Sequence, residues 1–251
     1  MRAQFVKTQN TLEFMSKLAA LEQRGASEAC LMVVDGDPGL GKSTVVQWWA
    51  VQSKAIFLRA KEEWRPAWFL RELLGAMKKQ PEHSFERMFR QAVQALGERA
   101  AVAQRDGESF AVVIDEVDHF CRDKRMMETI RDLSDMLEIP FILVGMGKVR
   151  HNIIRFPAIA SRVGQYAVFQ PSSLEDTQAM VTGLCEVPVK PDLVEFLYRA
   201  SRGRSREMKE GIKSIERFGK RNTGKEIGLA EMNGQVLMND RESGEPIVVR
   251  V

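Results

Sequence analysis

Eight consecutive residues have the types and the spacing of a loop that binds phosphate. They read Gly36-Asp37-Pro38-Gly39-Leu40-Gly41-Lys42-Ser43, with Thr44 next, and fit the pattern G-x-x-x-x-G-K-[ST]. In such a loop the glycines let backbone N–H groups turn toward one anion, and the following helix adds its partial positive charge. Lys42 would reach the β- and γ-phosphates, and the Ser43 hydroxyl would bind Mg²⁺. The loop therefore predicts binding of a nucleoside triphosphate with Mg²⁺; the alternative is a glycine-rich turn that binds nothing.

A second group of residues that could take part in catalysis is the acidic pair Asp115 and Glu116. The pair follows the apolar run Val112-Val113-Ile114. At the carboxyl end of a strand, Asp115 could hold hydrated Mg²⁺ while Glu116 polarises the water that attacks the γ-phosphate. Taken alone, such a pair also fits a strand end with solvated acids. Because it lies downstream of a phosphate loop, we interpret it as the hydrolytic half of the site.

The elements that must position both motifs follow from an alternation of short apolar runs and helical patterns. A strand at 30–34 leads into the loop, and a helix over 44–52 leaves it. Further strands are predicted at 55–59, 110–114, 141–144 and 166–169, and helices at 11–21, 66–77, 85–103 and 123–137. Short buried strands joined by helices indicate a parallel sheet covered on both faces. Three more helices, over 174–184, 191–200 and 206–218, predict a small helical lid.

Composition excludes several classes of protein. The chain has 251 residues, 44% hydrophobic content and a net charge of +3. No apolar run approaches the roughly 20 residues that span a bilayer, and the first residues lack a signal-peptide pattern, so we expect a cytoplasmic protein without membrane partners. The three cysteines, Cys30, Cys121 and Cys185, lack the spacing of a zinc site or a disulfide framework. The 37 basic residues permit nucleic-acid binding without requiring it.

The order of these parts resembles the AAA+ ATPases, which are P-loop NTPases of the ASCE type. Within them, the chain looks like the transposition-regulator ATPases, the phage Mu B protein and TnsC/TniB family. The resemblance covers roughly residues 5 to 220, and the segment from 111 to 170 is its most specific part. It is carried by the stretches 111–120, 129–137 and 139–145, and by Ser161-Arg162 ahead of a strand. It implies an α/β nucleotide-binding domain over 1–171, a helical lid subdomain over 172–223, and a C-terminal helix with a partly disordered tail over 224–251.

This resemblance also implies a function. Members of the family bind double-stranded DNA without strong sequence preference when loaded with ATP and Mg²⁺, and they form homo-oligomeric filaments or rings. They present target DNA to a transposase, which stimulates slow hydrolysis, in a bacterial host cell or a phage-infected bacterium. Two alternatives stay open. One is a helicase-loader-like ATPase that acts on a replication protein, and the other is a scaffold that binds ATP and hydrolyses almost none.

Two arginines take their roles from the resemblance. Arg162 stands where the family places an arginine finger that reaches the γ-phosphate of a neighbouring subunit, and Arg155 is a competing candidate. Arg206, in the segment Gly203-Arg204-Ser205-Arg206, resembles the sensor-two arginine that contacts phosphate, with Arg204 as the alternative. Either arginine could also be an ordinary solvated surface residue.

The sensor-one position departs from the family pattern. After the fourth strand the family offers a polar side chain, whereas this chain reads Gly145-Met146-Gly147. Methionine cannot orient a water molecule by a strong hydrogen bond. This difference favours a slow intrinsic ATPase or the scaffold alternative, unless His151 or Asn152 takes over the role.

DNA contacts are predicted on the helical insertion that follows the second strand. Related filaments turn this insertion toward DNA, which nominates four basic residues here: Lys78, Lys79, Arg87 and Arg90. Contacts of this kind would be sequence-tolerant and strongly dependent on salt. The alternative is that these side chains are merely solvated. The tryptophans, at positions 48, 49, 64 and 68, are interpreted as core residues rather than platforms for base stacking.

Overall fold

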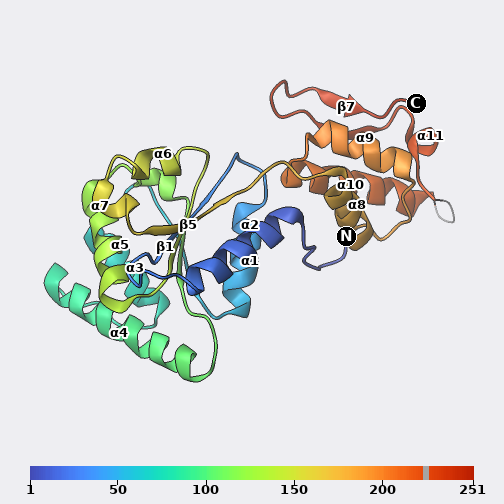
Figure 1. Cartoon of the computed structure of the whole chain (residues 1–251). Helices are drawn as coiled ribbons and strands as arrows, with labels where there is room; N and C mark the ends of the chain where they lie inside the picture. The colour runs from blue at the N-terminus through green and yellow to red at the C-terminus, as the bar shows by residue number, and fades with distance from the viewer. Residues whose placement is uncertain (223–225) are drawn as a thin grey trace. The chain divides into compact units, whose positions relative to one another are not determined.

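Five strands form one parallel sheet, as the sequence predicts (Figure 1). A computed structural model describes residues 1–222 and 226–251. The strands are β1 (Leu31–Asp35), β2 (Ile56–Arg59), β3 (Val112–Asp115), β4 (Phe141–Val144) and β5 (Val163–Val168). They lie in the order β2-β3-β4-β1-β5, and every neighbouring pair is parallel. Because all five carboxyl ends share one edge, the loops that leave β1, β3 and β4 meet there.

Seven helices and one 3-10 turn accompany the sheet in the described part of the chain. They are α1 (Gln9–Glu22), α2 (Lys42–Gln52), α3 (Pro66–Ala76), α4 (Phe85–Arg105), the 3-10 turn η1 (Val117–His119), α5 (Lys124–Leu137), α6 (Val149–Ile153) and α7 (Pro157–Ala160). The Ser84 side chain caps α4 and the Asp123 side chain caps α5, each accepting backbone N–H bonds from the first turn. The helices α6 and α7 were not predicted, because each is shorter than two turns and shows no amphipathic period.

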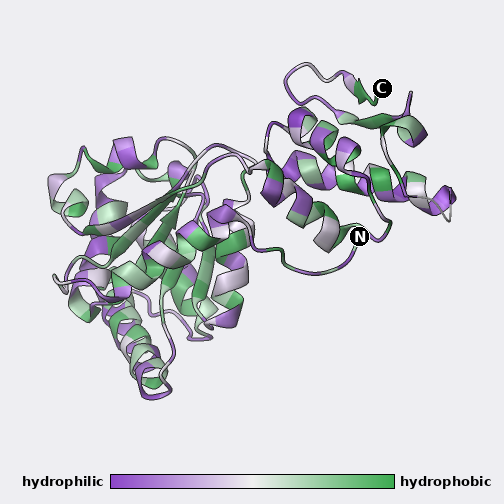
Figure 2. Cartoon of the chain, turned by 45° about the vertical axis from the view of Figure 1, so that its right-hand side comes forward, coloured by the Kyte–Doolittle hydropathy of each residue, from purple (hydrophilic) through white to green (hydrophobic). Residues whose placement is uncertain are grey.

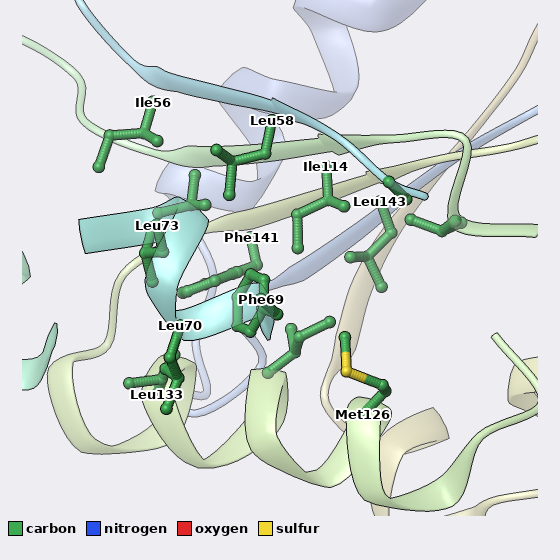
Figure 3. Close-up of a cluster of buried hydrophobic side chains, with 14 of the residues drawn as sticks. Ile56, Leu58, Phe69, Leu70, Leu73, Ile114, Met126, Leu133, Phe141 and Leu143 are labelled. Carbon is green, nitrogen blue, oxygen red and sulfur yellow. The ribbon is translucent and has the colours of Figure 1, made fainter. Parts of the chain in front are cut away.

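The core of the sheet domain is apolar on both sides of its central strands. Figure 2 shows the strands as a hydrophobic layer and the outer helical faces as more hydrophilic. On one face, side chains from the strands pack against α3 and α5 (Figure 3), and the buried set includes Leu58, Phe69, Leu70, Leu73, Ile114, Met126, Leu133, Phe141 and Leu143. Each large buried side chain of this kind contributes about 1.5–3 kcal/mol to folding. Trp49 and Trp64 are buried, as expected for core residues, but the prediction is wrong for Trp68, which is 40% exposed and whose Nε1 donates to Glu72.

The chain divides into two compact units, one of 13–37 and 42–169 and one of 1–12, 38–41 and 170–251. The second contains α8 (Leu174–Leu184), α9 (Pro191–Ser201), α10 (Ser205–Arg221), α11 (Leu229–Met232), β6 (Val236–Asn239) and β7 (Pro246–Val248). The predicted scheme assigned residues 1–12 to the nucleotide-binding domain. Instead, the Gln9 N–H donates to Asp176, and Asn10 exchanges hydrogen bonds with the backbone of Gln170, so these residues belong to the helical unit.

A two-stranded antiparallel hairpin, β6 with β7, occupies much of the tail that was predicted to be partly disordered. Leu237 and Val249 are buried in one cluster with Ile212 and Ile215 of α10. The two strands have only four and three residues, and a polar turn separates them. Such short strands show too little alternation of apolar and polar residues to be predicted from the sequence. The predicted boundary between residues 223 and 224 lies outside the described residues. Within the described part of the chain, no helix is long and apolar enough to cross a membrane.

All three cysteines are free and buried. Burial raises the pKa of each thiol, so the thiolate form is disfavoured at neutral pH. Cys30 ends the segment before β1, Cys121 lies in the loop after β3, and Cys185 follows α8. The thiols are therefore structural groups in this fold.

Candidate functional site

The predicted phosphate loop connects the carboxyl end of β1 to the first turn of α2. Gly36 has φ +141° and Gly41 has φ +89°, values that side chains with a Cβ rarely adopt. A Cβ on Gly36 would also lie 2.7 Å from the carbonyl oxygen of Phe169, so only glycine fits there. Lys42 and Ser43 are in the first turn of α2, where free N–H groups and the helix dipole favour an anion.

Lys42 is the buried cation of the loop. Its side chain is 7% exposed, and its Nζ donates to the carbonyl oxygens of Gly36 (2.6 Å) and Asp37 (2.8 Å). Burial lowers the pKa of Lys42, and the nearby carboxylates of Asp35 and Asp118 act in the opposite direction. A buried ammonium that is bonded to neutral carbonyls, with anions only nearby, is a group that a phosphate would complement.

The acidic pair lies at the carboxyl end of β3, where Asp115 is buried and Glu116 is partly exposed. Asp115 is 2% exposed; its Oδ1 accepts the Glu116 N–H at 3.0 Å, and its Oδ2 has no hydrogen-bond partner among the described residues. Such an oxygen suits a hard cation, so the donor set of Asp115 and the Ser43 hydroxyl fits Mg²⁺. Glu116 has the left-handed conformation (φ 60°, ψ 39°), which costs about 1–2 kcal/mol and is typical of functional sites.

Arg59 is a neighbour of both carboxylates that sequence reasoning missed. The register of β2 on β3 pairs Arg59 with Asp115. Its Nη2 lies 3.7 Å from Oδ2 of Asp115, and its Nε lies 3.7 Å from Oε1 of Glu116. The sequence shows that a charged residue, Arg59, ends the second strand. It does not show that this strand pairs with the strand that carries the acidic pair, so the contact could not be predicted. Arg59 thus lies within ion-pair distance of both carboxylates and partly offsets their negative charge.

Two further aspartates tie the loops of the site together, and neither was predicted. Asp118 Oδ2 accepts the Met146 N–H at 2.7 Å, and burial raises the pKa of Asp118. Asp35 Oδ1 accepts the Gly36 N–H at 2.8 Å, and its Oδ2 accepts the Arg150 N–H at 3.4 Å. Carboxylates at the ends of β1 and β3 therefore hold the loop that follows β4.

The proposed substitutes for a polar sensor-one residue differ in their surroundings. Asn152 is buried and its Nδ2 donates to Cys121 Sγ at 3.3 Å, so it serves the packing between two loops rather than the site. His151 is exposed on α6. The Met146 side chain is exposed as well, and only its backbone N–H is engaged by Asp118. The polar groups around this position are thus a backbone amide and a carboxylate.

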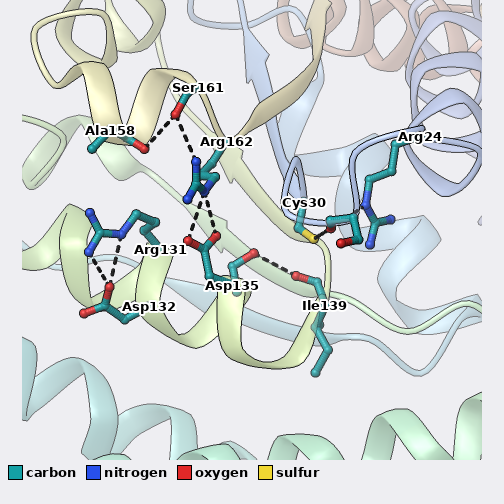
Figure 4. Close-up of polar contacts among 11 residues, drawn as sticks. Arg24, Cys30, Arg131, Asp132, Asp135, Ile139, Ala158, Ser161 and Arg162 are labelled. Carbon is teal, nitrogen blue, oxygen red and sulfur yellow. Dashed lines mark hydrogen bonds and ion pairs between the residues drawn. The ribbon is translucent and has the colours of Figure 1, made fainter.

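Arg162 lies at the amino end of the parallel strands, whereas the phosphate loop leaves their carboxyl end. In the pairing of β1 with β5, Leu31 is opposite Val163 and Asp35 is opposite Val168, so about five residues of strand, or roughly 16 Å, separate Arg162 from Gly36. Its guanidinium is paired with both oxygens of Asp135 on α5, the nearer at 3.0 Å (Figure 4). This position does not allow Arg162 to serve the loop of its own subunit.

Most of the other predicted residues lie on the surface. Arg155 is exposed between α6 and α7, and Arg206 is exposed in the first turn of α10. Arg204, just before that helix, lies 3.8 Å from Glu242.

The four nominated DNA contacts are also exposed. Lys78 follows α3 and Arg87 lies in the first turn of α4. The other two are ion-paired: Lys79 lies 3.4 Å from Glu98, and Arg90 lies 3.2 Å from Glu86.

A parallel sheet of this strand order, with a glycine-rich loop after β1 and an acidic pair after β3, defines a P-loop nucleotide-binding domain. The family model described as "AAA domain" matches residues 24–153, just over half of the chain. The chain belongs to this AAA domain family. The predicted AAA+ type of fold is therefore confirmed. A comparison with curated protein sequences finds no match.

Solved structures share the fold at low sequence identity. Cdc6p from Pyrobaculum aerophilum has a TM-score of 0.64 and 16% identity, over 92% of this chain and 68% of that one. Orc1 from Aeropyrum pernix, solved in complex with DNA, has a TM-score of 0.61 and 14% identity, over 90% and 64%. RuvB from Thermotoga maritima, a Holliday junction branch migration motor, has a TM-score of 0.58 and 16% identity, over 90% and 67%. The chain thus spans about two thirds of the length of these structures.

Proposed function

We propose that this protein is a Mg²⁺-dependent ATPase that assembles on duplex DNA without strong sequence preference and presents it to a transposase. The observation that carries the catalytic part is the divided acidic pair. Asp115 is buried with one oxygen free of hydrogen bonds, whereas Glu116 is partly exposed beside Arg59. A buried carboxylate suits a metal, and an open one suits a water molecule.

Nucleotide binding would exchange the partners of the loop. The Lys42 ammonium would leave the carbonyls of Gly36 and Asp37 for the β- and γ-phosphate oxygens, so its hydrogen bonds would go to anionic acceptors in place of neutral ones. The N–H groups of the loop and of the first turn of α2 would point at the same oxygens. Ser43 and Asp115 would hold Mg²⁺, which supplies positive charge to the phosphate oxygens.

Hydrolysis would use Glu116 as the general base. As the water oxygen forms its bond to the γ-phosphorus, Glu116 accepts a proton, and the β–γ bridging oxygen leaves with ADP. Arg59 lies within ion-pair distance of this carboxylate. The loop after β4 contributes a backbone amide, held by Asp118, and no polar side chain from Met146. A site with this composition is consistent with slow turnover in the isolated subunit.

The DNA and transposase parts of the proposal are supported by the resemblance of segments 111–120, 129–137 and 139–145 to the transposition-regulator ATPases. Electron microscopy of the protein with random-sequence duplex DNA tests them, with a slowly hydrolysed ATP analogue and with ADP. We expect filaments or rings on DNA with the analogue and none with ADP. DNA association in neither state would contradict the proposal and turn attention to a protein client, such as the replication protein of a helicase loader.

Replacement of Arg162 by alanine tests the role of this residue between subunits. We expect ATP affinity to stay within about twofold and hydrolysis by the assembled protein to fall by at least about 100-fold, since an arginine finger stabilises the transition state. The control is Asp135→Ala, which removes the ion pair with Arg162 and leaves the guanidinium. If Asp135→Ala loses as much activity, Arg162 acts through that ion pair and not across the interface.

A further inference from the structure

The segment that contains β4, α6, α7 and β5 is depleted of negative charge. Although the chain has 34 acidic residues, none occurs between Glu138 and Glu175. The same stretch contains four basic residues: Lys148, Arg150, Arg155 and Arg162. Arg162 is paired with Asp135 at the amino end of β5. The other three lie in or beside α6, just after β4. The loop that follows β4 is therefore strongly cationic.

The loop between β3 and α5, residues 116–123, lies against the loop after β4. The loop after β3 carries one exposed cation, Arg122, together with the acidic residues Glu116, Asp118 and Asp123. Two contacts join the two loops. One is the hydrogen bond from Asn152 Nδ2 to Cys121 Sγ, and the other is the bond from the Met146 N–H to Asp118. Since Asn152 and Cys121 are buried at the contact, the loops pack together as one body. We call the exposed residues Arg122, Lys148, Arg150 and Arg155 the basic loop surface.

The cations of the basic loop surface are free of acidic partners. Within residues 1–222 and 226–251, Arg122, Lys148 and Arg155 form no ion pair. Arg150 lies over the ring of Tyr166, 5.1 Å from its centroid, which orients the guanidinium without neutralising it. The neighbouring Asp123 is engaged as the cap of α5.

The residues first nominated for DNA are placed differently. Lys79 and Arg90, on the insertion of α3 and α4, already have carboxylate partners, Glu98 and Glu86. A phosphate would have to compete with those carboxylates, whereas an unpaired surface cation releases only solvent and ions when it binds. Within the described residues Lys78 and Arg87 form no ion pair, so the charge distribution favours the unpaired cations of the basic loop surface only over Lys79 and Arg90.

We propose that the basic loop surface binds the sugar-phosphate backbone of duplex DNA. This inference rests on the proposed function and assigns its DNA site. Guanidinium and ammonium groups without accompanying base-reading side chains give sequence-tolerant contacts. The surface is also continuous with the nucleotide site, because the loop after β3 begins at Glu116 and the loop after β4 begins at Gly145. DNA bound there would contact the two loops that carry the general base Glu116 and the Met146 amide. Contact with these loops would link DNA binding to ATP hydrolysis.

The test compares two double variants in equilibrium binding to random-sequence duplex DNA over a salt series, with a slowly hydrolysed ATP analogue present. Arg122→Gln/Lys148→Gln removes two unpaired cations from the basic loop surface. Arg155 is left intact because it is also a candidate finger. We expect the slope of log affinity against log salt to fall by about 2, and the affinity at low salt to fall on the order of tenfold or more. Melting temperature and nucleotide binding, measured alongside, establish that the variant is folded.

The matched control is Lys79→Gln/Arg90→Gln, which removes the same charge from two ion-paired positions of the insertion. We expect its affinity to stay within about twofold of the wild type and its salt slope to be unchanged. The assignment is overturned if the control loses as much as the loop variant, or if the loop variant binds like the wild type. Those results would leave the proposed function standing. If the wild-type protein binds no DNA with either nucleotide, the proposed function itself fails.

Discussion

Replacement of Lys42 by alanine is expected to abolish nucleotide binding, with a loss of affinity of about 10²–10⁴-fold. Two charge-assisted hydrogen bonds to phosphate, at about 1.5–3 kcal/mol each, account for this range. Lys42 is the buried cation of the loop, and among the residues that the structure describes its Nζ donates only to the carbonyl oxygens of Gly36 and Asp37. Titration of the variant with a fluorescent ATP analogue or by calorimetry measures the effect.

The control for this experiment is Lys54→Ala. Lys54 is an exposed lysine that pairs with Glu108 at 2.8 Å, outside the loop. We expect this variant to bind ATP like the wild type, because a surface ion pair contributes only about 0–1 kcal/mol to stability. Thermal unfolding without nucleotide shows whether Lys42→Ala is folded. Wild-type ATP affinity in a folded Lys42→Ala protein would mean that Gly36–Ser43 is not the phosphate site.

Replacement of Glu116 by glutamine is expected to lower ATP hydrolysis by about 10²–10⁴-fold and to leave ATP affinity nearly unchanged. Glutamine has the same size and can still accept a hydrogen bond, but it cannot take the proton from water. The Mg²⁺ site at Asp115 and the cation of Lys42 remain, so binding persists. Release of phosphate under single-turnover conditions, with DNA present and absent, is the measurement.

Glu138→Gln is a matched control for this change. Glu138 is another exposed glutamate with a left-handed backbone, at φ 51°, and it caps the end of α5 away from the site. The same substitution at Glu138 tests whether removal of a negative charge from a residue with a left-handed backbone lowers ATP turnover by itself. We expect this variant to turn over ATP like the wild type. If wild-type turnover is no faster than that of Glu116→Gln, the protein is a nucleotide-bound scaffold and the ATPase proposal is wrong.

Local sequence patterns were enough to predict the elements of the sheet domain. The glycine-rich loop, the apolar strands and the acidic pair each lie within a few consecutive residues, so their physical requirements are visible in the sequence. The contact of Arg59 with Glu116 was not visible, because it depends on β2 pairing with β3. The bond between Asp118 and the Met146 amide likewise joins two loops that only the strand order brings together.

Short elements were the other limit of prediction. The helices α6 and α7 have five and four residues, too few to show a helical period. These short helices carry Arg150 and flank Arg155, and so they shape the basic loop surface. The charge pattern of the segment was present in the sequence from the start, but its meaning depended on the Asn152–Cys121 contact that joins it to the loop after β3.

The burial of the three native thiols makes the wild-type protein suitable for selective chemical labelling. Maleimide dyes react with thiolates, and burial both shields Cys30, Cys121 and Cys185 and raises the pKa of each. New cysteines at the exposed positions Val51 and Leu174, one in each compact unit, would therefore carry a donor and an acceptor fluorophore without removal of the native cysteines. Energy transfer between them would report how the separation of the two units changes through a cycle of nucleotide binding and release.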